Sequence, residues 1–240
     1  MNIKKTLKLS TGTVLVVLLL GFCKPAFAQE SGGMGYGLKL GSTFNQFNSS
    51  GLMIGGNFGG FFSYRVTDFM NVQAELLYML HGGSRDGFVR DYSFTGGNVV
   101  YIQYSNRAVL MHSIKVPLMV GFNLPDQVSE SVTPRLILGI SYGYMMAAFE
   151  IHDKTYKFTD GTEGIVGKEK ENVKAEYEPH QFDIIGGVAL DFTLSSGKVM
   201  TMDVRYQHGL NDINLFKSST NGGAIHQQIL SVNFGIPLPF

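Results

Sequence analysis

The chain has 240 residues, with 19 basic and 19 acidic side chains, one cysteine and no tryptophan. A single cysteine excludes a disulfide framework and a thiolate metal site. The even balance of charge gives no reason to expect a nucleic-acid partner.

The first 28 residues predict a cleaved secretory signal peptide. They contain a basic start, an apolar run over residues 9–22 that is too short to span a bilayer comfortably, and the small-x-small cleavage site Ala26-Phe27-Ala28. The alternative, an uncleaved membrane anchor, is disfavoured by the length of that run. Removal of this segment leaves one domain, residues 29–240, with 15 basic and 19 acidic residues and no cysteine.

Eight stretches of the mature chain alternate between apolar and polar residues with a period of two, which indicates β-strands. In chain order they are residues 36–47, 52–65, 70–81, 113–124 and 135–148, the two halves of the hairpin 182–210, and residues 225–234. Residues 99–110 alternate as well, so we expect the fourth strand to project beyond the membrane. Pro117 cannot donate to a strand ladder and indicates a bulge.

Short turns and longer polar connections alternate along the chain, with the connection between the first two strands as the exception. This pattern is typical of outer-membrane barrels, in which the short turns and both termini are periplasmic. The longer connections include residues 82–98 and residues 150–179, and the latter hold eight acidic residues and five lysines. We expect both to be solvated extracellular loops.

The alternation alone is also compatible with a soluble lipocalin-type barrel, which is apolar inside. Three observations favour a membrane barrel: aromatic residues near the strand ends, many glycines on the polar face, and few charges of both signs on that face. The aromatic residues expected to form two girdles are Tyr36, Tyr64, Phe122 and Phe192 at one rim and Phe44, Tyr78, Tyr144 and Phe182 at the other. A lysine or arginine on the lipid face would cost about 2–4 kcal/mol at the bilayer midplane. The sequence therefore predicts an all-β, eight-stranded, antiparallel, up-and-down transmembrane barrel.

Charged residues on the polar face are expected to point into the lumen. They are Lys39, Arg65, Glu75, Lys115, Arg135, Asp183, Asp191, Asp203 and Arg205. Because an eight-stranded barrel has no room for an open channel, we expect a plug of salt bridges rather than a conduction path.

Several segments together resemble a known family. They are GLKLGSTF (37–44), GFFSYRVT (60–67), QAELLY (73–78), IKVPL (114–118) and DVRYQHGL (203–210). In their order and spacing they are similar to the eight-stranded outer-membrane barrel proteins of Bacteroidetes-type bacteria, the PorT family, with an OmpX- and OmpA-like barrel. The resemblance implies the barrel and the outer membrane, but no single activity. Phe240 suits the signal read by the assembly machinery, whereas Pro237 and Pro239 depart from the usual ending and weaken the expected pairing there.

Catalysis and metal binding are not expected. The segment ending in His208 resembles the motif of barrel lipid A deacylases, but Leu210 stands where those enzymes have a nucleophilic serine. His112 and Ser113 are adjacent and therefore point to opposite faces. The segment that begins at Asp160 lacks the ligand spacing of a calcium loop, and no cofactor motif occurs.

The sequence predicts a non-enzymatic outer-membrane protein with a filled lumen, which binds or scaffolds through its extracellular loops. Its expected partners are outer-membrane lipid and lipopolysaccharide, the assembly machinery, and an envelope protein that contacts residues 82–98 and 150–179. The alternatives are a structural protein or small passive pore and, more distantly, a lipid A-modifying enzyme, which Ser113 and His208 variants would test.

Overall fold

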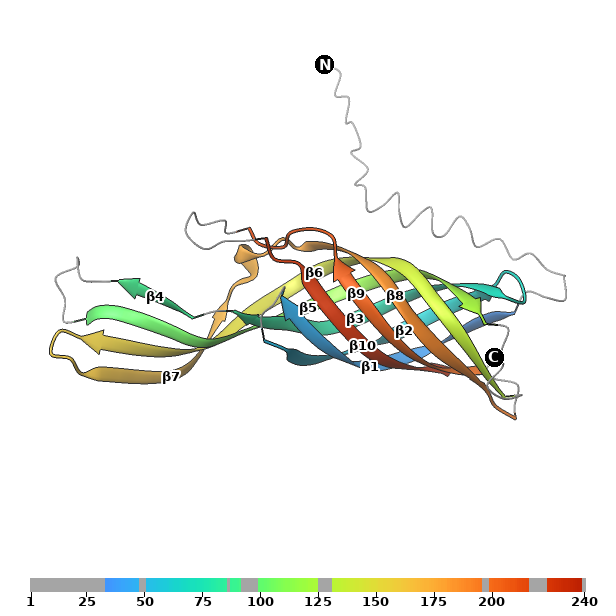
Figure 1. The fold of residues 1–240 in the computed structure, drawn as a ribbon, viewed down its shortest axis with the longest axis horizontal. Coiled ribbons are helices and arrows are strands. Elements are labelled where there is room, and N and C mark those ends of the chain that lie inside the picture. Colours follow the sequence, from blue (N-terminus) through green and yellow to red (C-terminus); the bar gives the residue numbers. More distant parts are fainter. Residues whose placement is uncertain are drawn as a thin grey trace, which may run out of the picture. The chain divides into compact units, whose positions relative to one another are not determined.

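The computed structural model (Figure 1) describes residues 33–47, 51–85, 87–91, 99–124, 131–195, 199–215 and 224–238. The predicted signal peptide, residues 1–28, and the predicted assembly signal, Phe240, lie outside the described residues. Within the described part, no helix is long and apolar enough to cross a membrane.

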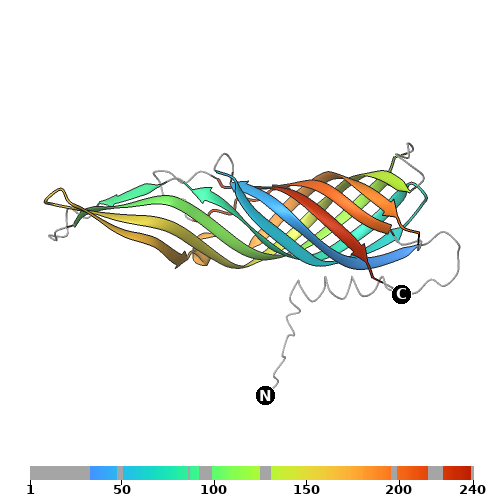
Figure 2. The ribbon, with the colours of Figure 1, turned by 90° about the horizontal axis from the view of Figure 1, so that it is seen from below.

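The described residues form one antiparallel sheet and a single 3-10 turn, η2 (Lys174–Glu176). The strands are β1 (Met34–Phe47), β2 (Met53–Arg65), β3 (Met70–Arg85), β4 (Phe88–Asp91), β5 (Val99–Asn123), β6 (Val132–Phe158), β7 (Glu163–Asn172), β8 (His180–Thr193), β9 (Val199–Gly209) and β10 (Gln227–Pro237). Eight of them follow the order β5-β3-β2-β1-β10-β9-β8-β6, and pairing of β5 with β6 closes the ring. The predicted eight-stranded antiparallel barrel is confirmed (Figures 1 and 2).

The ring is polar inside and apolar outside. In β8, for example, Phe182 is 50% exposed on the outer face, whereas its neighbour Asp183 is 2% exposed. Lumen-facing glycines let the wall curl tightly, because a Cβ added at Gly55 or Gly59 would lie 2.0 Å from a backbone oxygen of β3. Small residues on the inner face thus make room for the large charged side chains beside them.

β5 and β6 are far longer than the barrel needs. They have 25 and 27 residues, more than twice the roughly 9–11 that span a bilayer as a tilted strand. Above the ring, β4 pairs with β5 and β7 pairs with β6. We call this four-stranded extension the blade: β4, β7, residues 99–106 and residues 149–158. The ribbon view shows it continuing beyond the eight-stranded ring (Figure 1).

The prediction of solvated loops at residues 82–98 and 150–179 is wrong for the described part of these segments. β3 continues to Arg85, β4 follows, β6 continues to Phe158, and β7 returns along it. The reason is that charged residues lie on both faces of the blade, and this weakens the alternation that marks a membrane strand.

The bulge expected at Pro117 lies elsewhere. Pro117 interrupts the pairs between β5 and β3 without changing their register. One of the register shifts between β5 and β6 falls between His112 and Ser113, where Met146 is the extra residue of β6.

At the other end of the ring, Pro237 pairs with Gly37, and the Leu238 N–H donates to the Tyr36 carbonyl at 3.0 Å. The expected weakening of terminal pairing is therefore wrong as far as Leu238.

Candidate functional site

The centre of the lumen is filled by two cations and two anions. Lys39 Nζ lies 2.5 Å from Glu75 Oε1 and 2.8 Å from Asp203 Oδ2. Arg205 donates twice to Glu75, at 2.7 and 2.9 Å, and once to Asp203 at 2.8 Å. All four side chains are nearly fully buried. Buried charges persist only when each is paired, so these four residues, which we call the central cluster, form one electrostatic unit.

A second buried cluster lies on the extracellular side of the first. Lys115 Nζ is 2.7 Å from Asp183 Oδ2 and 3.5 Å from the amide oxygen of Gln227. Gln227 also contacts the ring of His81, whose Nε2 lies 2.8 Å from Ser113 Oγ. These side chains come from β3, β5, β8 and β10, so they join opposite sides of the barrel wall.

The periplasmic end is more open. Arg135 pairs with Asp191 at 3.0 Å, and Thr201 donates to the same carboxylate at 2.7 Å. These residues line a cavity of about 380 Å³ at the ends of the strands. Arg65 also lines it but is exposed at the end of β2, so it lies outside the buried clusters to which the sequence assigned it.

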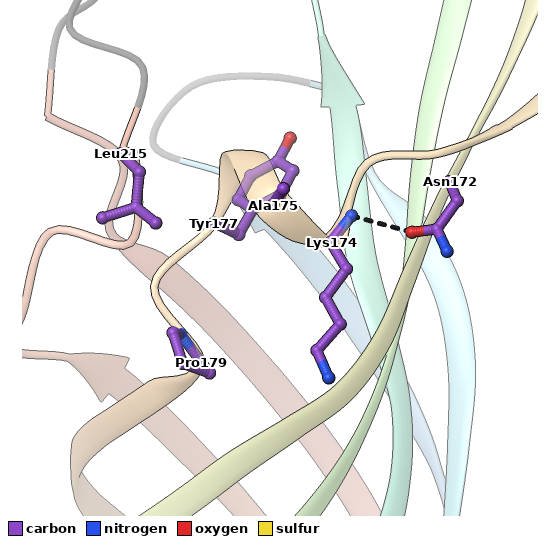
Figure 3. Close-up of a pocket in the computed structure, with 6 residues that line it drawn as sticks. All are labelled: Asn172, Lys174, Ala175, Tyr177, Pro179 and Leu215. Carbon is purple, nitrogen blue, oxygen red and sulfur yellow. Dashed lines mark hydrogen bonds between the residues drawn. The ribbon is translucent and has the colours of Figure 1, made fainter.

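The extracellular end of the ring is covered by two short segments, residues 173–178 and 212–215, which we call the cap. Tyr177 forms a β-bridge with Asn214, and the Glu178 N–H donates to the Ile213 carbonyl at 2.9 Å. Val173, Tyr177 and Ile213 pack on apolar side chains of β1, β5 and β6. The cap therefore has a small hydrophobic core of its own; Figure 3 shows Tyr177 on one of its two segments and Leu215 on the other.

Burial raises the pKa of Tyr177 to about 12. An ion network surrounds this ring: Arg107 binds both oxygens of Glu150 at 2.6 and 2.7 Å, and Arg85 binds Glu176 at 3.2 Å. The Arg85 guanidinium lies 5.6 Å from the Tyr177 ring centroid. None of these residues was expected from the sequence. Most lie in stretches read as polar loops, whereas Arg107 lies in the predicted extension of the fourth strand. No periodic pattern indicates the burial of Tyr177.

All eight predicted girdle residues lie on the outer face of the ring. The exposed ones are Tyr36, Tyr64, Tyr144 and Phe182, and the half-buried ones are Phe44, Tyr78, Phe122 and Phe192. The register places the first group of the prediction at the end near the chain termini and the second at the end near the cap.

His208 and Ser113, the two residues considered for catalysis, lie on opposite faces of the barrel wall. His208 faces outward and stacks between Tyr206 and His226, with ring centroids 6.4 and 6.2 Å away. Ser113 faces the lumen and meets His81 instead, a pair that the sequence did not reveal. Both members of that pair are fully buried, and the partner on the other nitrogen of His81 is an amide rather than a carboxylate. Among the described residues, no group of three or more His, Cys, Asp or Glu side chains is arranged to hold a metal ion.

Several solved barrels resemble the structure at low identity. Neisserial surface protein A (NspA) aligns with a TM-score of 0.42 and 11% identity, over 87% of this chain and 100% of that one. The outer membrane enzyme PagL gives 0.39 and 13%, over 83% and 99%. Ail, the attachment invasion locus protein of Yersinia pestis, in complex with the heparin analogue sucrose octasulfate, gives 0.37 and 11%, over 85% and 99%. At these values the likenesses carry no argument about activity.

A search of curated proteins by sequence found no match. The family described as "Outer membrane protein beta-barrel domain" matches residues 27–214, which is most of the chain. With the closed eight-stranded ring and its apolar outer face, this match places the protein in the outer membrane. The chain belongs to the outer membrane protein beta-barrel domain family.

Proposed function

We propose that this protein is a non-conducting, non-enzymatic barrel that binds or scaffolds an envelope protein through its blade. The observation that carries the proposal is the length of β5 and β6, which extends a paired four-stranded sheet beyond the ring. A barrel with a purely structural role in the membrane would not need such an extension. Long extracellular structure on a rigid scaffold commonly carries function.

The closed lumen supports the same proposal. The central cluster lies across the barrel, and the cap covers its extracellular end. An ion crossing the lumen would have to break buried salt bridges, which favours a role for the outer surface over transport. The absence of a carboxylate at His81 and the burial of Ser113 favour a role without catalysis.

The test is gentle detergent extraction from the native outer membrane, followed by size determination and identification of companions. The informative variant shortens the blade by joining Asp153 directly to Lys168, which face each other in the ladder. This trimming leaves Glu150 and the cap in place. A control variant replaces Asp160 of the turn with Ser and keeps the blade together with Gly161, whose φ of +81° favours glycine. A stoichiometric companion that is lost only on shortening supports the proposal, and a lone barrel in all three samples contradicts it.

The alternative is a small passive pore. The observation that favours it is the cavity of about 380 Å³ at the periplasmic end, which reaches Arg135 and Asp191. Planar-bilayer recordings decide between the two: we expect no stable channel events, whereas steady conductance that rises on neutralising the central cluster would favour the pore.

We also propose that residues 1–28 are a cleaved signal peptide and that the chain is a PorT-type protein of a Bacteroidetes-type bacterium. The support is the cleavage-site pattern and the ordered segments described above. Sequencing the amino terminus of the mature protein tests the first point, because it should begin at Gln29.

A further inference from the structure

The outer wall carries the same four-part arrangement twice near its extracellular rim. In the first, Lys170 Nζ lies 4.1 Å from the centroid of the Phe149 ring. That ring meets His112 edge-on, with centroids 5.8 Å apart and planes at 88°. His112 Nδ1 is 2.5 Å from the hydroxyl of Tyr78. We call these four residues the first rim cluster.

The second arrangement lies between β6 and β8. Lys174 Nζ is 5.9 Å from the Tyr144 ring, whose centroid is 5.5 Å from that of His180 at 60°. His180 Nδ1 is 2.8 Å from the hydroxyl of Tyr142. Figure 3 shows the Lys174 side chain extending from η2 away from Leu215. These four residues are the second rim cluster.

The bulge at Met146 lets β6 supply aromatic rings to both clusters. Below it, Tyr142 and Tyr144 face outward, as alternation from the outward Ile140 requires. Above it, the extra residue shifts the alternation, and Phe149 rather than Ala148 faces outward, opposite Leu110. Without the bulge, Phe149 would point towards the interior and the first rim cluster could not form.

Both clusters lie at the edge of the lipid-facing surface. Next to His112 on the outer face is Ile114, 40% exposed, and next to His180 is Phe182, 50% exposed. Residues on the same outer edge of other strands are also polar: His208 and His226 stack there, and the Gln46 and Gln228 side chains share a hydrogen bond. Aromatic and polar side chains at this level lie among lipid headgroups.

Each cluster carries one lysine, and neither Lys170 nor Lys174 forms an ion pair with the described residues. Glu169 lies on the opposite face of the blade beside His152 and Lys154. Glu178 lies at the second rim cluster itself, where its carboxylate accepts the backbone N–H of His180 at 3.3 Å.

The geometry points to two binding sites for the phosphate groups of outer-leaflet lipid headgroups, one at each rim cluster. Lysine is a common phosphate ligand. When a tyrosine hydroxyl donates to Nδ1 of a neutral histidine, the proton of that imidazole is on Nε2, which becomes a second donor to the phosphate. In each cluster one aromatic ring contacts both the lysine and the histidine. Neither site depends on the proposed role of the blade in binding a protein.

The experiment is native mass spectrometry of the mature, detergent-solubilised protein titrated with bis-phosphorylated lipid A or with its dephosphorylated counterpart. We expect two phosphorylated lipids at saturation and clearly weaker retention of the dephosphorylated form. Lys170→Ala and Lys174→Ala should each weaken one site by about tenfold, the size expected for loss of one charge-assisted contact. The double variant should lose both sites.

Lys168→Ala is the matched control, because Lys168 is on the same strand and face as Lys170 but further from the ring. The Arg versions of both rim lysines should retain the lipid, and altered gel mobility on heating reports that each variant is folded. Equal retention of both lipids, or a double alanine variant that binds as the native chain does, would overturn the proposal. Displacement of the lipid by millimolar inorganic phosphate would overturn the assignment to a lipid headgroup.

Discussion

Two strands, β5 and β6, run through both the ring and the blade and meet different surroundings in each. In the ring, lipid lies on one side and a crowded lumen on the other, so polarity switches strictly at each residue. In the blade charges lie on both faces, because charged residues such as Asp153 and Lys154 are adjacent in the strand. The comparison teaches that alternation in this chain reports the surroundings of a strand rather than the presence of a strand.

The two regions also differ in how they satisfy the backbone. The ring has no edge, which is what a lipid environment demands. The blade has two, β4 and β7. The β7 edge carries Lys168, Glu169, Lys170 and Glu171 in succession, and charge of this kind discourages edge-to-edge pairing with other chains. The same kind of substitution, such as neutralising a charge, should therefore change the stability to unfolding by different amounts in the ring and in the blade.

The largest expected effect is loss of a buried charge in the ring. Glu75→Gln leaves Lys39 and Arg205 with one carboxylate between them, and breaking a buried pair costs about 3–5 kcal/mol. Urea unfolding in detergent measures the change. Adding Lys39→Met should recover part of it, because charge balance returns. An unchanged midpoint for Glu75→Gln would show that the central cluster does not stabilise the barrel.

The next effect is pH-dependent and concerns the cap. Burial raises the pKa of Tyr177 from its ordinary value of 10.0 to about 12, so the folded state favours the neutral phenol. Its contribution is complete below about pH 10 and is lost as the pH rises from 10 to 12, by about 2–3 kcal/mol in all. Hydrogen exchange of the cap amides should report this opening.

Tyr177→Phe provides the control for that prediction. The Tyr177 hydroxyl has no hydrogen-bond partner among the described residues, so its removal should leave the cap intact at neutral pH. The exchange of the cap amides between pH 10 and 12 should then no longer depend on a tyrosine titration. Identical pH profiles for the two proteins would rule out Tyr177 as the titrating group.

A smaller effect tests the crowding of the lumen. Gly59→Ala places a Cβ 2.0 Å from the Leu76 carbonyl oxygen, whereas Gly60→Ala on the outer face places one 3.5 Å from the Gly37 oxygen. We expect about 1–3 kcal/mol of destabilisation for the first and little for the second. The unfolding midpoints of the two variants measure this difference. Equal midpoints would mean that the backbone of the barrel wall shifts to make room for the added Cβ.

The smallest effect is expected in the blade. Lys154 and Glu169 form an ion pair at 3.3 Å, and the Glu169 side chain is 40% exposed. Solvent-exposed pairs contribute about 0–1 kcal/mol, so Glu169→Gln should barely change the unfolding midpoint, in contrast to Glu75→Gln. A loss of stability comparable to that of Glu75→Gln would show that water does not screen the Lys154–Glu169 pair.

Much of the fold was predictable because lipid imposes a local rule. Each residue of a membrane strand faces lipid or lumen, so the outward Phe182 and the inward Asp183 can be assigned from sequence spacing alone. The same rule failed at residues 150–179, where charges on both faces of the strands remove the contrast, and at Met146, where one extra residue shifts the alternation without a sequence signal. Tyr177 is buried against Phe47, far away along the chain, and no local pattern could reveal that contact.

The sequence by itself determined the number of strands in the ring, the face that each of them presents to lipid and the set of charges available to the lumen. These properties follow from the period of two and from the cost of a charge in hydrocarbon. Only the tertiary structure decided that Glu75 joins Lys39 and Arg205, that Ser113 meets His81 rather than His208, and that Lys170 and Lys174 repeat one arrangement at the rim. Such contacts depend on register and closure of the ring, which bring together residues as far as 130 positions apart.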